Sequence, residues 1–152
     1  MARIYLQQEQ YALAQAQLDQ LIAINAEHYP AQLELAKLRV KSGDIAAAVD
    51  ALEGAVYIYP YDIELYQDLA GYQTSLGNWE RVAQARRALL ALDPVDRAEA
   101  HYQLAFAYGR AGNRSSAREQ ILYALEIAPN FQRAQELLLS LRAATPAATE
   151  AQ

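Results

Sequence analysis

The sequence contains no cysteine, and its 152 residues include only two histidines and six glycines. Without cysteine there is neither a disulfide nor a thiolate zinc site, and the redox compartment stays open. No apolar run approaches the roughly 20 residues that span a bilayer, and the opening MARIYLQQEQ lacks the apolar core of a signal peptide. We therefore expect a soluble chain, cytoplasmic or periplasmic if its source is bacterial, with the compartment left open.

Basic residues are fewer than acidic ones, and the formal net charge is −5. Broad binding of nucleic acid needs a basic surface and is not expected. The chain has no P-loop, no Gly-x-Gly-x-x-Gly and no histidine pair at metal-ligand spacing. His101 is interpreted as a packed structural residue, His28 has no paired carboxylate motif, and Ser115 and Ser116 belong to a turn and helix start. We expect no enzyme activity, no catalytic residue, no metal and no cofactor.

What the sequence does contain is a repeat, in a composition rich in alanine, leucine and glutamine that favours helix. Pro60, Pro94 and Pro129 follow one another by 34 and 35 residues. Gly43, Gly77 and Gly112 keep the same steps. A period of this length indicates a stacked helical array.

Each unit is predicted to hold two helices. A glycine closes the first helix, because it tolerates the left-handed conformation at that position. The next residue is Asp44, Asn78 or Asn113, which can cap the second helix. Small residues that let helices approach closely lie on the second helix, and they are Ala48, Ala55, Ala117 and Ala124. Proline ends the unit, with Asp62, Asp96 or Asn130 as a candidate cap for the next one.

These residues resemble the tetratricopeptide repeat. The family pattern runs from Leu-small through an aromatic, Gly, Ala, a bulky residue and Ala to Pro. The fourth unit matches at Leu104, Ala105, Tyr108, Gly112, Ala117, Ile121, Ala124 and Pro129. The second matches at Leu35, Ala36, Gly43, Ala48, Leu52, Ala55 and Pro60. The third departs from the pattern at Arg86 and Leu89, where we expect local repacking helped by Ala85 and Ala88.

The resemblance implies an all-α, right-handed superhelical solenoid of antiparallel helix pairs with a C-terminal capping helix. Residues 1–142 would form one array: a partial first repeat over 1–28, repeats over 29–62, 63–97 and 98–131, and the capping helix over 132–142. Residues 143–152 are small and polar and are expected to form a disordered tail. Because about half of the first helix is absent, we expect a fragment of a larger bacterial protein, with Met1 added or exposed by cloning. Ile4 and Tyr5 would lie at that open edge, where Glu9 replaces the turn glycine.

The stretch YIYPYD, residues 57–62, could be a half-buried strand, an aromatic ligand cradle or the end of a unit. Because it recurs at the position of LALDPVD and EIAPNF, it is interpreted as a loop that ends a repeat. Tyr59 and Tyr61 are expected to pack or to lie exposed rather than to anchor a partner.

In this family the first helix of each pair lines a concave face that binds partners. Carried over by position, that face would present Leu33, Lys37, Val40, Lys41, Gln67, Gly71, Thr74, Tyr102, Phe106, Arg110 and Arg133. Two interpretations stay open. Either the face is a groove with a basic end and an aromatic end, suited to a peptide with acidic and apolar side chains, or the lysines are simply solvated and Tyr102 packs between repeats.

The resemblance implies a non-catalytic module for protein–protein interaction, whose partner is a protein or peptide. The carboxylate clamp of chaperone-binding members has no match, because its positions hold Leu33, Lys37, Asp68, Glu99 and Gln103. Two alternatives stay open: a self-assembling scaffold that dimerises through the open first repeat, and an accessory module of a larger enzyme such as a bacterial peptidase.

Overall fold

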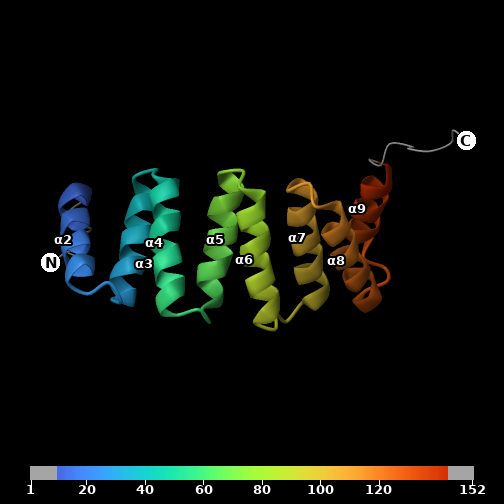
Figure 1. The fold of residues 1–152 in the computed structure, drawn as a ribbon, viewed down its shortest axis with the longest axis horizontal. Coiled ribbons are helices and arrows are strands. Elements are labelled where there is room, and N and C mark those ends of the chain that lie inside the picture. The colour runs from blue at the N-terminus through green and yellow to red at the C-terminus, as the bar shows by residue number, and fades with distance from the viewer. Residues whose placement is uncertain (1–9, 144–152) are drawn as a thin grey trace, which may run out of the picture. The chain divides into compact units, whose positions relative to one another are not determined.

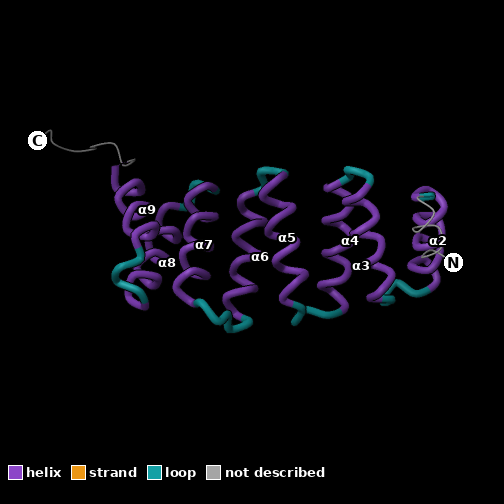
Figure 2. The backbone as a smooth tube through the Cα atoms, turned by 180° about the vertical axis from the view of Figure 1, so that it is seen from behind, coloured by secondary structure: helices purple, strands orange, loops and turns teal. Residues whose placement is uncertain are grey.

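The computed structural model describes residues 10–143, and within that range it contains eight helices and no strand (Figure 1). Short loops join consecutive helices (Figure 2). The all-α helical repeat predicted from the sequence is confirmed. The predictions for the open first repeat, with Ile4, Tyr5 and Glu9, and for residues 144–152 lie outside the described residues.

The chain divides into two compact units, one ending at Leu76 and the other beginning at Gly77. This boundary falls inside the third predicted repeat, between its two helices. The repeat boundaries drawn from the sequence stay predictions.

The first unit holds α2 (Tyr11–Ile24), α3 (Tyr29–Lys41), α4 (Ile45–Ile58) and α5 (Ile63–Ser75). Each of these helices packs against the next one in the sequence. Its core is made of buried leucines and alanines, among them Leu18, Leu35, Leu38, Leu52 and Leu65.

The second unit holds α6 (Trp79–Ala91), α7 (Arg97–Arg110), α8 (Arg114–Ile127) and α9 (Gln132–Ala143). One buried cluster joins α6 to α7 and consists of Val82, Ala83, Leu104 and Ala107. Another joins α7, α8 and α9 and consists of Ala105, Ile121, Ala124 and Ala134. Leu137 and Leu138 pack against the latter cluster, so α9 covers the last helix pair. Ala143, expected to begin the tail, is instead the last residue of α9.

The alanines predicted at helix contacts are confirmed as core residues. Ala48, Ala55, Ala117 and Ala124 are all 0% exposed. At the departure from the family pattern, Arg86 is half-buried while Ala85 is buried and Ala88 is half-buried. Burial lowers the pKa of Arg86 and the nearby carboxylate of Glu99 opposes that shift.

The three turn glycines adopt the left-handed conformation that was predicted. Their φ angles are 82° at Gly43, 73° at Gly77 and 81° at Gly112. In the first and third of these turns the amide after the glycine bonds back into the helix, from Asp44 to the Arg39 carbonyl and from Asn113 to the Tyr108 carbonyl, both at 2.9 Å. These bonds satisfy carbonyls at the helix end, and a side chain at the glycine position would strain the turn.

Most of the predicted helix caps are confirmed. A side-chain oxygen accepts a backbone amide at the start of α4 (Asp44), α5 (Asp62), α7 (Asp96) and α8 (Asn113). Asn78 precedes α6 but makes no side-chain capping bond, and Asn130 lies two residues before Gln132, where α9 begins. The prediction for Asn78 is wrong, because the residue type alone does not fix the orientation of the side chain. The prediction for Asn130 stays a prediction.

The YIYPYD stretch forms the end of α4 and the loop before α5. Tyr59 terminates α4 in an extended conformation, Pro60 and Tyr61 form a turn, and Asp62 caps α5. The interpretation of this stretch as a helix end followed by a loop is therefore confirmed, whereas its place at the end of a repeat stays a prediction. No helix between residues 10 and 143 combines the length and apolar character that crossing a membrane requires.

Candidate partner-binding surfaces

In the first unit, α3 presents two lysines beside two partly buried apolar residues. Lys37 and Lys41 are exposed, whereas Leu33 and Val40 are half-buried. Lys37 and Lys41 lie four residues apart and therefore share one face of the helix. The ammonium of Lys37 is 3.6 Å from a carboxylate oxygen of Glu34 on the same helix.

These residues border a hollow of about 280 Å³ in the first unit. Its lining comes mostly from α3, with one tyrosine from α5, and comprises Glu34, Lys37, Leu38, Val40, Lys41 and Tyr72. An apolar floor with lysines at its rim can hold a small apolar side chain next to a carboxylate.

The predicted residues of α5 form an open, polar surface. Gln67, Gly71 and Thr74 are exposed, and a side chain added at Gly71 would meet no atom within 4 Å. The Thr74 hydroxyl donates to the Ala70 carbonyl at 2.6 Å. Burial, and then the charge of Glu64, raise the pKa of Asp68, while Lys37 lowers it. Part of the positive charge predicted at this end is therefore offset by acidic neighbours.

In the second unit, Tyr102 of α7 belongs to a packed group that we call the Tyr102 cluster: Glu99, Tyr102, Phe131 and Arg133. The rings of Tyr102 and Phe131 are 5.2 Å apart between centroids. The Arg133 guanidinium lies 5.0 Å from the Tyr102 ring and 5.2 Å from the Phe131 ring. It also pairs with the Glu99 carboxylate at 2.6 Å. Tyr102 is thus half-buried by α9, and the charge of Arg133 is balanced.

Further along α7, Phe106 belongs to a more open group, the Phe106 cluster: Trp79, Phe106 and Arg110. Phe106 is 39% exposed and meets Trp79 edge-to-face, with centroids 6.0 Å apart. The Arg110 guanidinium lies 4.8 Å from the Trp79 ring centroid. No carboxylate pairs with Arg110 in the described part of the chain, so this cluster offers apolar rings beside an exposed cation.

Both histidines have structural contacts. His28 caps α3, since its Nδ1 accepts the Ala31 amide at 3.1 Å. His101 shares a hydrogen bond of 2.9 Å with Gln120 and lies 5.4 Å from the Tyr123 ring. Across residues 10–143 no group of three or more His, Asp or Glu side chains could hold a metal ion.

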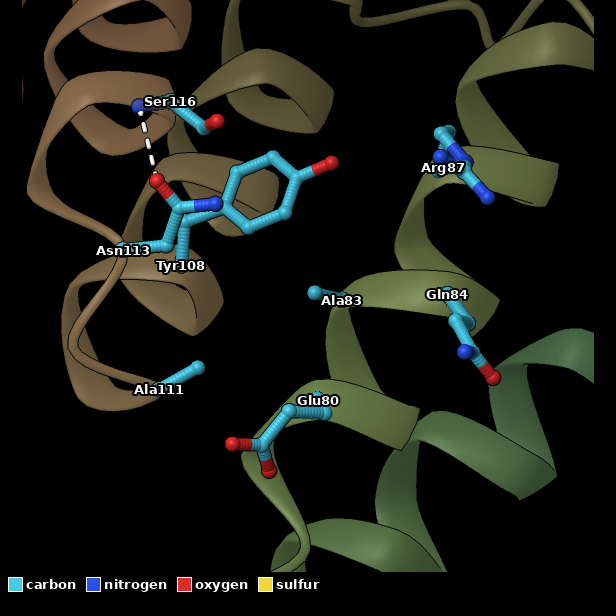
Figure 3. Close-up of a pocket in the computed structure, with 8 residues that line it drawn as sticks. All are labelled: Glu80, Ala83, Gln84, Arg87, Tyr108, Ala111, Asn113 and Ser116. Carbon is cyan, nitrogen blue, oxygen red and sulfur yellow. Dashed lines mark hydrogen bonds between the residues drawn. The ribbon is translucent and has the colours of Figure 1, made fainter.

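A polar pocket of about 410 Å³ in the second unit was not predicted from the sequence (Figure 3). Its lining comprises Glu80, Ala83, Gln84, Arg87, Tyr108, Ala111, Asn113 and Ser116. Figure 3 shows the Tyr108 ring reaching from α7 towards α6, while Asn113 is occupied by its bond to the Ser116 amide. The pocket carries both signs of charge, from Glu80 and Arg87.

Two models of the tetratricopeptide repeat match the sequence, one over residues 5–71 and the other over residues 98–131. Together they cover about two thirds of the chain. The chain belongs to the tetratricopeptide repeat family. The two matched segments include α3 and α7, so the predicted first helices of the second and fourth repeats lie inside recognised repeats.

Solved structures of other tetratricopeptide proteins are similar in fold. A crystal structure of MamA aligns with a TM-score of 0.61 at 19% identity, covering 94% of this chain and 83% of that one. Naa15/Naa10 bound to HypK-THB aligns with a TM-score of 0.72 at 20% identity, over 93% of this chain and 27% of that one. The first tetratricopeptide domain of Spaghetti (RPAP3), bound to the HSP90 peptide SRMEEVD, gives 0.56 at 19% identity, over 76% and 91%. No curated protein matches the sequence significantly.

The tetratricopeptide register located the α7 residues but not their partners. Trp79 completes the Phe106 cluster from α6. In the Tyr102 cluster, Phe131 comes from the loop before α9 and Glu99 from one turn earlier on α7. The signal available for Trp79 was its size at a position just after the turn glycine. Its contact with Phe106 depends on how neighbouring repeats pack, which the sequence does not state.

Proposed function

We propose that the chain is a non-catalytic protein-interaction module that holds a peptide or protein segment on α3 and α5 of its first unit and on α7 and α9 of its second unit. In the tetratricopeptide register these are the first helices of the repeats and the capping helix. The proposal rests on the family and on one observation above all, the partly exposed Phe106 cluster. Phe106 remains 39% exposed although it packs edge-to-face on Trp79, whose ring in turn lies against Arg110. Aromatic and arginine side chains dominate the energetics of protein interfaces.

The chemistry of these surfaces indicates the class of ligand. The Phe106 cluster supplies rings for an apolar or aromatic side chain and a guanidinium for a carboxylate. On α3, Lys37 and Lys41 flank the hollow of about 280 Å³ in the same way. A peptide with alternating apolar and acidic side chains fits both, and tetratricopeptide structures bound to HypK-THB and to an HSP90 peptide support a role of this general kind.

The HSP90 peptide bound in the Spaghetti structure is not expected to bind this chain. The positions of the chaperone-binding clamp hold Asp68 and Glu99, whose carboxylates would repel a C-terminal carboxylate. Glu99 is in addition engaged by Arg133 and Gln103. We expect the peptide SRMEEVD to bind no better than a scrambled version of itself.

We also propose that the chain is not an enzyme. The contacts of His28 and His101 support this, because Nδ1 of the first ring serves a helix cap and Nδ1 of the second serves a contact between helices. Assays for turnover of model peptides and esters test this. Activity of the parent that a folded His101→Ala variant has lost would contradict it.

The experiment is a selection of displayed random peptides on the immobilised chain, followed by measurement of Kd for the selected peptides. Phe106→Ala is expected to weaken binding about tenfold or more, and Lys37→Glu by a smaller factor. Matched controls lie on α8: Leu122, 49% exposed, changed to Ala, and the exposed Arg118 changed to Glu. Selected peptides that bind Phe106→Ala as well as the parent, or that are lost equally in the controls, would contradict the proposal.

A further inference from the structure

Three tyrosines of the first unit form an exposed surface that the proposed function does not use. We call it the tyrosine patch, made of Tyr29, Tyr59 and Tyr61. Tyr59 meets Tyr29 edge-to-face at 5.9 Å and 72°, and meets Tyr61 in the same manner at 6.2 Å and 79°. Tyr59 is 51% exposed and Tyr61 is 70% exposed. Three tyrosines in contact, two of them facing water, are a contiguous aromatic surface rather than scattered single residues.

The patch is held in place by the start of α5. The Tyr29 hydroxyl donates to Asp62, and the other carboxylate oxygen of Asp62 accepts the Glu64 amide at 2.9 Å. One aspartate thus fixes both the helix cap and the tyrosine at the end of the row. A surface that is already ordered loses little conformational entropy when it binds.

The charge around the patch is negative. Two carboxylates, Asp62 and Glu64, act through their charge on Tyr29 and help to raise its pKa. Glu64 and Asp62 also act on Asp68, where Lys37 partly offsets them. Aromatic rings have electron-rich faces, so rings and carboxylates here attract the same kind of ligand, a cation.

We propose that the tyrosine patch binds arginine side chains of a basic segment in a partner protein. A planar guanidinium stacks on aromatic faces and pairs with carboxylates at the same time, which an ammonium does less well. A purely apolar partner would have to desolvate Asp62 and Glu64 without pairing them, which is costly. A nucleic acid would bring its phosphates against these carboxylates. This site is separate from the Phe106 cluster, which lies in the other unit.

The test uses the whole chain and a fluorescent peptide that alternates arginine with glycine, at physiological salt. Two comparison peptides replace arginine with lysine or with citrulline, its uncharged analogue. We expect the parent to prefer arginine over lysine and to bind the citrulline peptide weakly. Tyr59→Ser combined with Tyr61→Ser should weaken arginine binding about tenfold, and Glu64→Gln should weaken it by a smaller factor.

Tyr57→Ser is the matched control, because Tyr57 is 85% exposed on α4 and takes no part in the ring contacts of the patch. It removes an exposed tyrosine and leaves the net charge unchanged, as the double variant does. Helix content and melting temperature must match the parent, and Tyr61→Ser alone serves if the double variant does not fold. Equal binding by the double variant and the parent would overturn the proposal, since it would assign binding to the overall negative charge. Equal binding of arginine and citrulline peptides would overturn it too.

Discussion

Alanine side chains set the distance between paired helices in both units. Ala48 and Ala55 of α4 and Ala117 and Ala124 of α8 are 0% exposed, so no space is left for a larger residue. This makes the repeat sensitive to added volume at these positions and tolerant of it on the exposed face of the same helices.

Ala48→Leu and Ala117→Leu should each lower the free energy of unfolding by about 1–3 kcal/mol, because the added methyl groups force the helices apart. Ala46→Leu is the control, since Ala46 lies on α4 and is exposed. Urea denaturation measures the difference. Midpoints equal to the parent for Ala48→Leu would show that the helix pair can open to accept the side chain.

Tyr29 gives the first unit a dependence on alkaline pH. Burial, and next the hydrogen bond to Asp62, raise the pKa of Tyr29 from 10.0 to about 12. The folded chain therefore keeps this proton when the unfolded chain releases it. Its contribution to stability is fully present below pH 10.0 and is lost as the pH rises towards about 12.

The free energy of unfolding, measured at about pH 9 and about pH 11, tests this. Between these two pH values, the Tyr29→Phe variant should lose less of that free energy than the parent. Tyr57→Phe is the control and should lose as much as the parent. Identical losses for all three proteins would mean that Tyr29 ionises in the folded state as readily as in the unfolded state.

At the scale of the elements, α9 completes the second unit by covering the cluster of Ala105, Ile121 and Ala124. It does so with one side of the helix only. Ala134 is 0% exposed and Leu138 packs on the cluster, whereas Leu139 is 62% exposed.

Leu138→Ala should therefore lower the free energy of unfolding by about 1–3 kcal/mol, below the loss at a fully buried leucine. Leu139→Ala on the same helix should change it by less than about 0.5 kcal/mol. Thermal or urea unfolding distinguishes them. Equal effects at the two positions would contradict the packing of α9 described here.

The elements could be predicted from the sequence because their ends are chemically marked. Gly43, Gly77 and Gly112 are turns that need positive φ, and Asp44, Asp62, Asp96 and Asn113 are caps. The orientation of individual side chains could not be predicted in the same way. Asn78 has the residue type of a cap but makes no capping bond, and His28, which the sequence did not suggest, caps α3.

The same limit applies to the candidate site. The repeat register placed Tyr102 and Phe106 on one face of α7, but it could not supply Phe131, Trp79 or the Arg133–Glu99 pair. These contacts join different helices, and their distances depend on packing that a linear period does not encode. The YIYPYD stretch was correctly predicted to contain a helix end and a loop, but its ring contacts depend on Tyr29, which lies on another helix.

For the whole molecule, self-assembly and a role as an accessory module of a larger enzyme stay alternatives to binding a separate partner. Sedimentation across a wide range of concentration tests the first. A constant mass near 16.9 kDa would remove the homodimer, and a mass that rises with concentration would favour it. The full coding sequence of the gene tests the second, since a metal-site motif outside these 152 residues would support an enzyme and further repeats would oppose one.

Partner binding on α3 and α5 in the first unit, and on α7 and α9 in the second, is what distinguishes the proposed function from its alternatives. The most direct test follows backbone amide NMR signals while a selected peptide is added to the chain. We predict that shifts concentrate on these four helices, with the largest around Phe106 and Lys37, and that α4, α6 and α8 change little apart from Trp79. Shifts that concentrate on α4 and α8 instead, or that spread evenly over both units, would contradict the account.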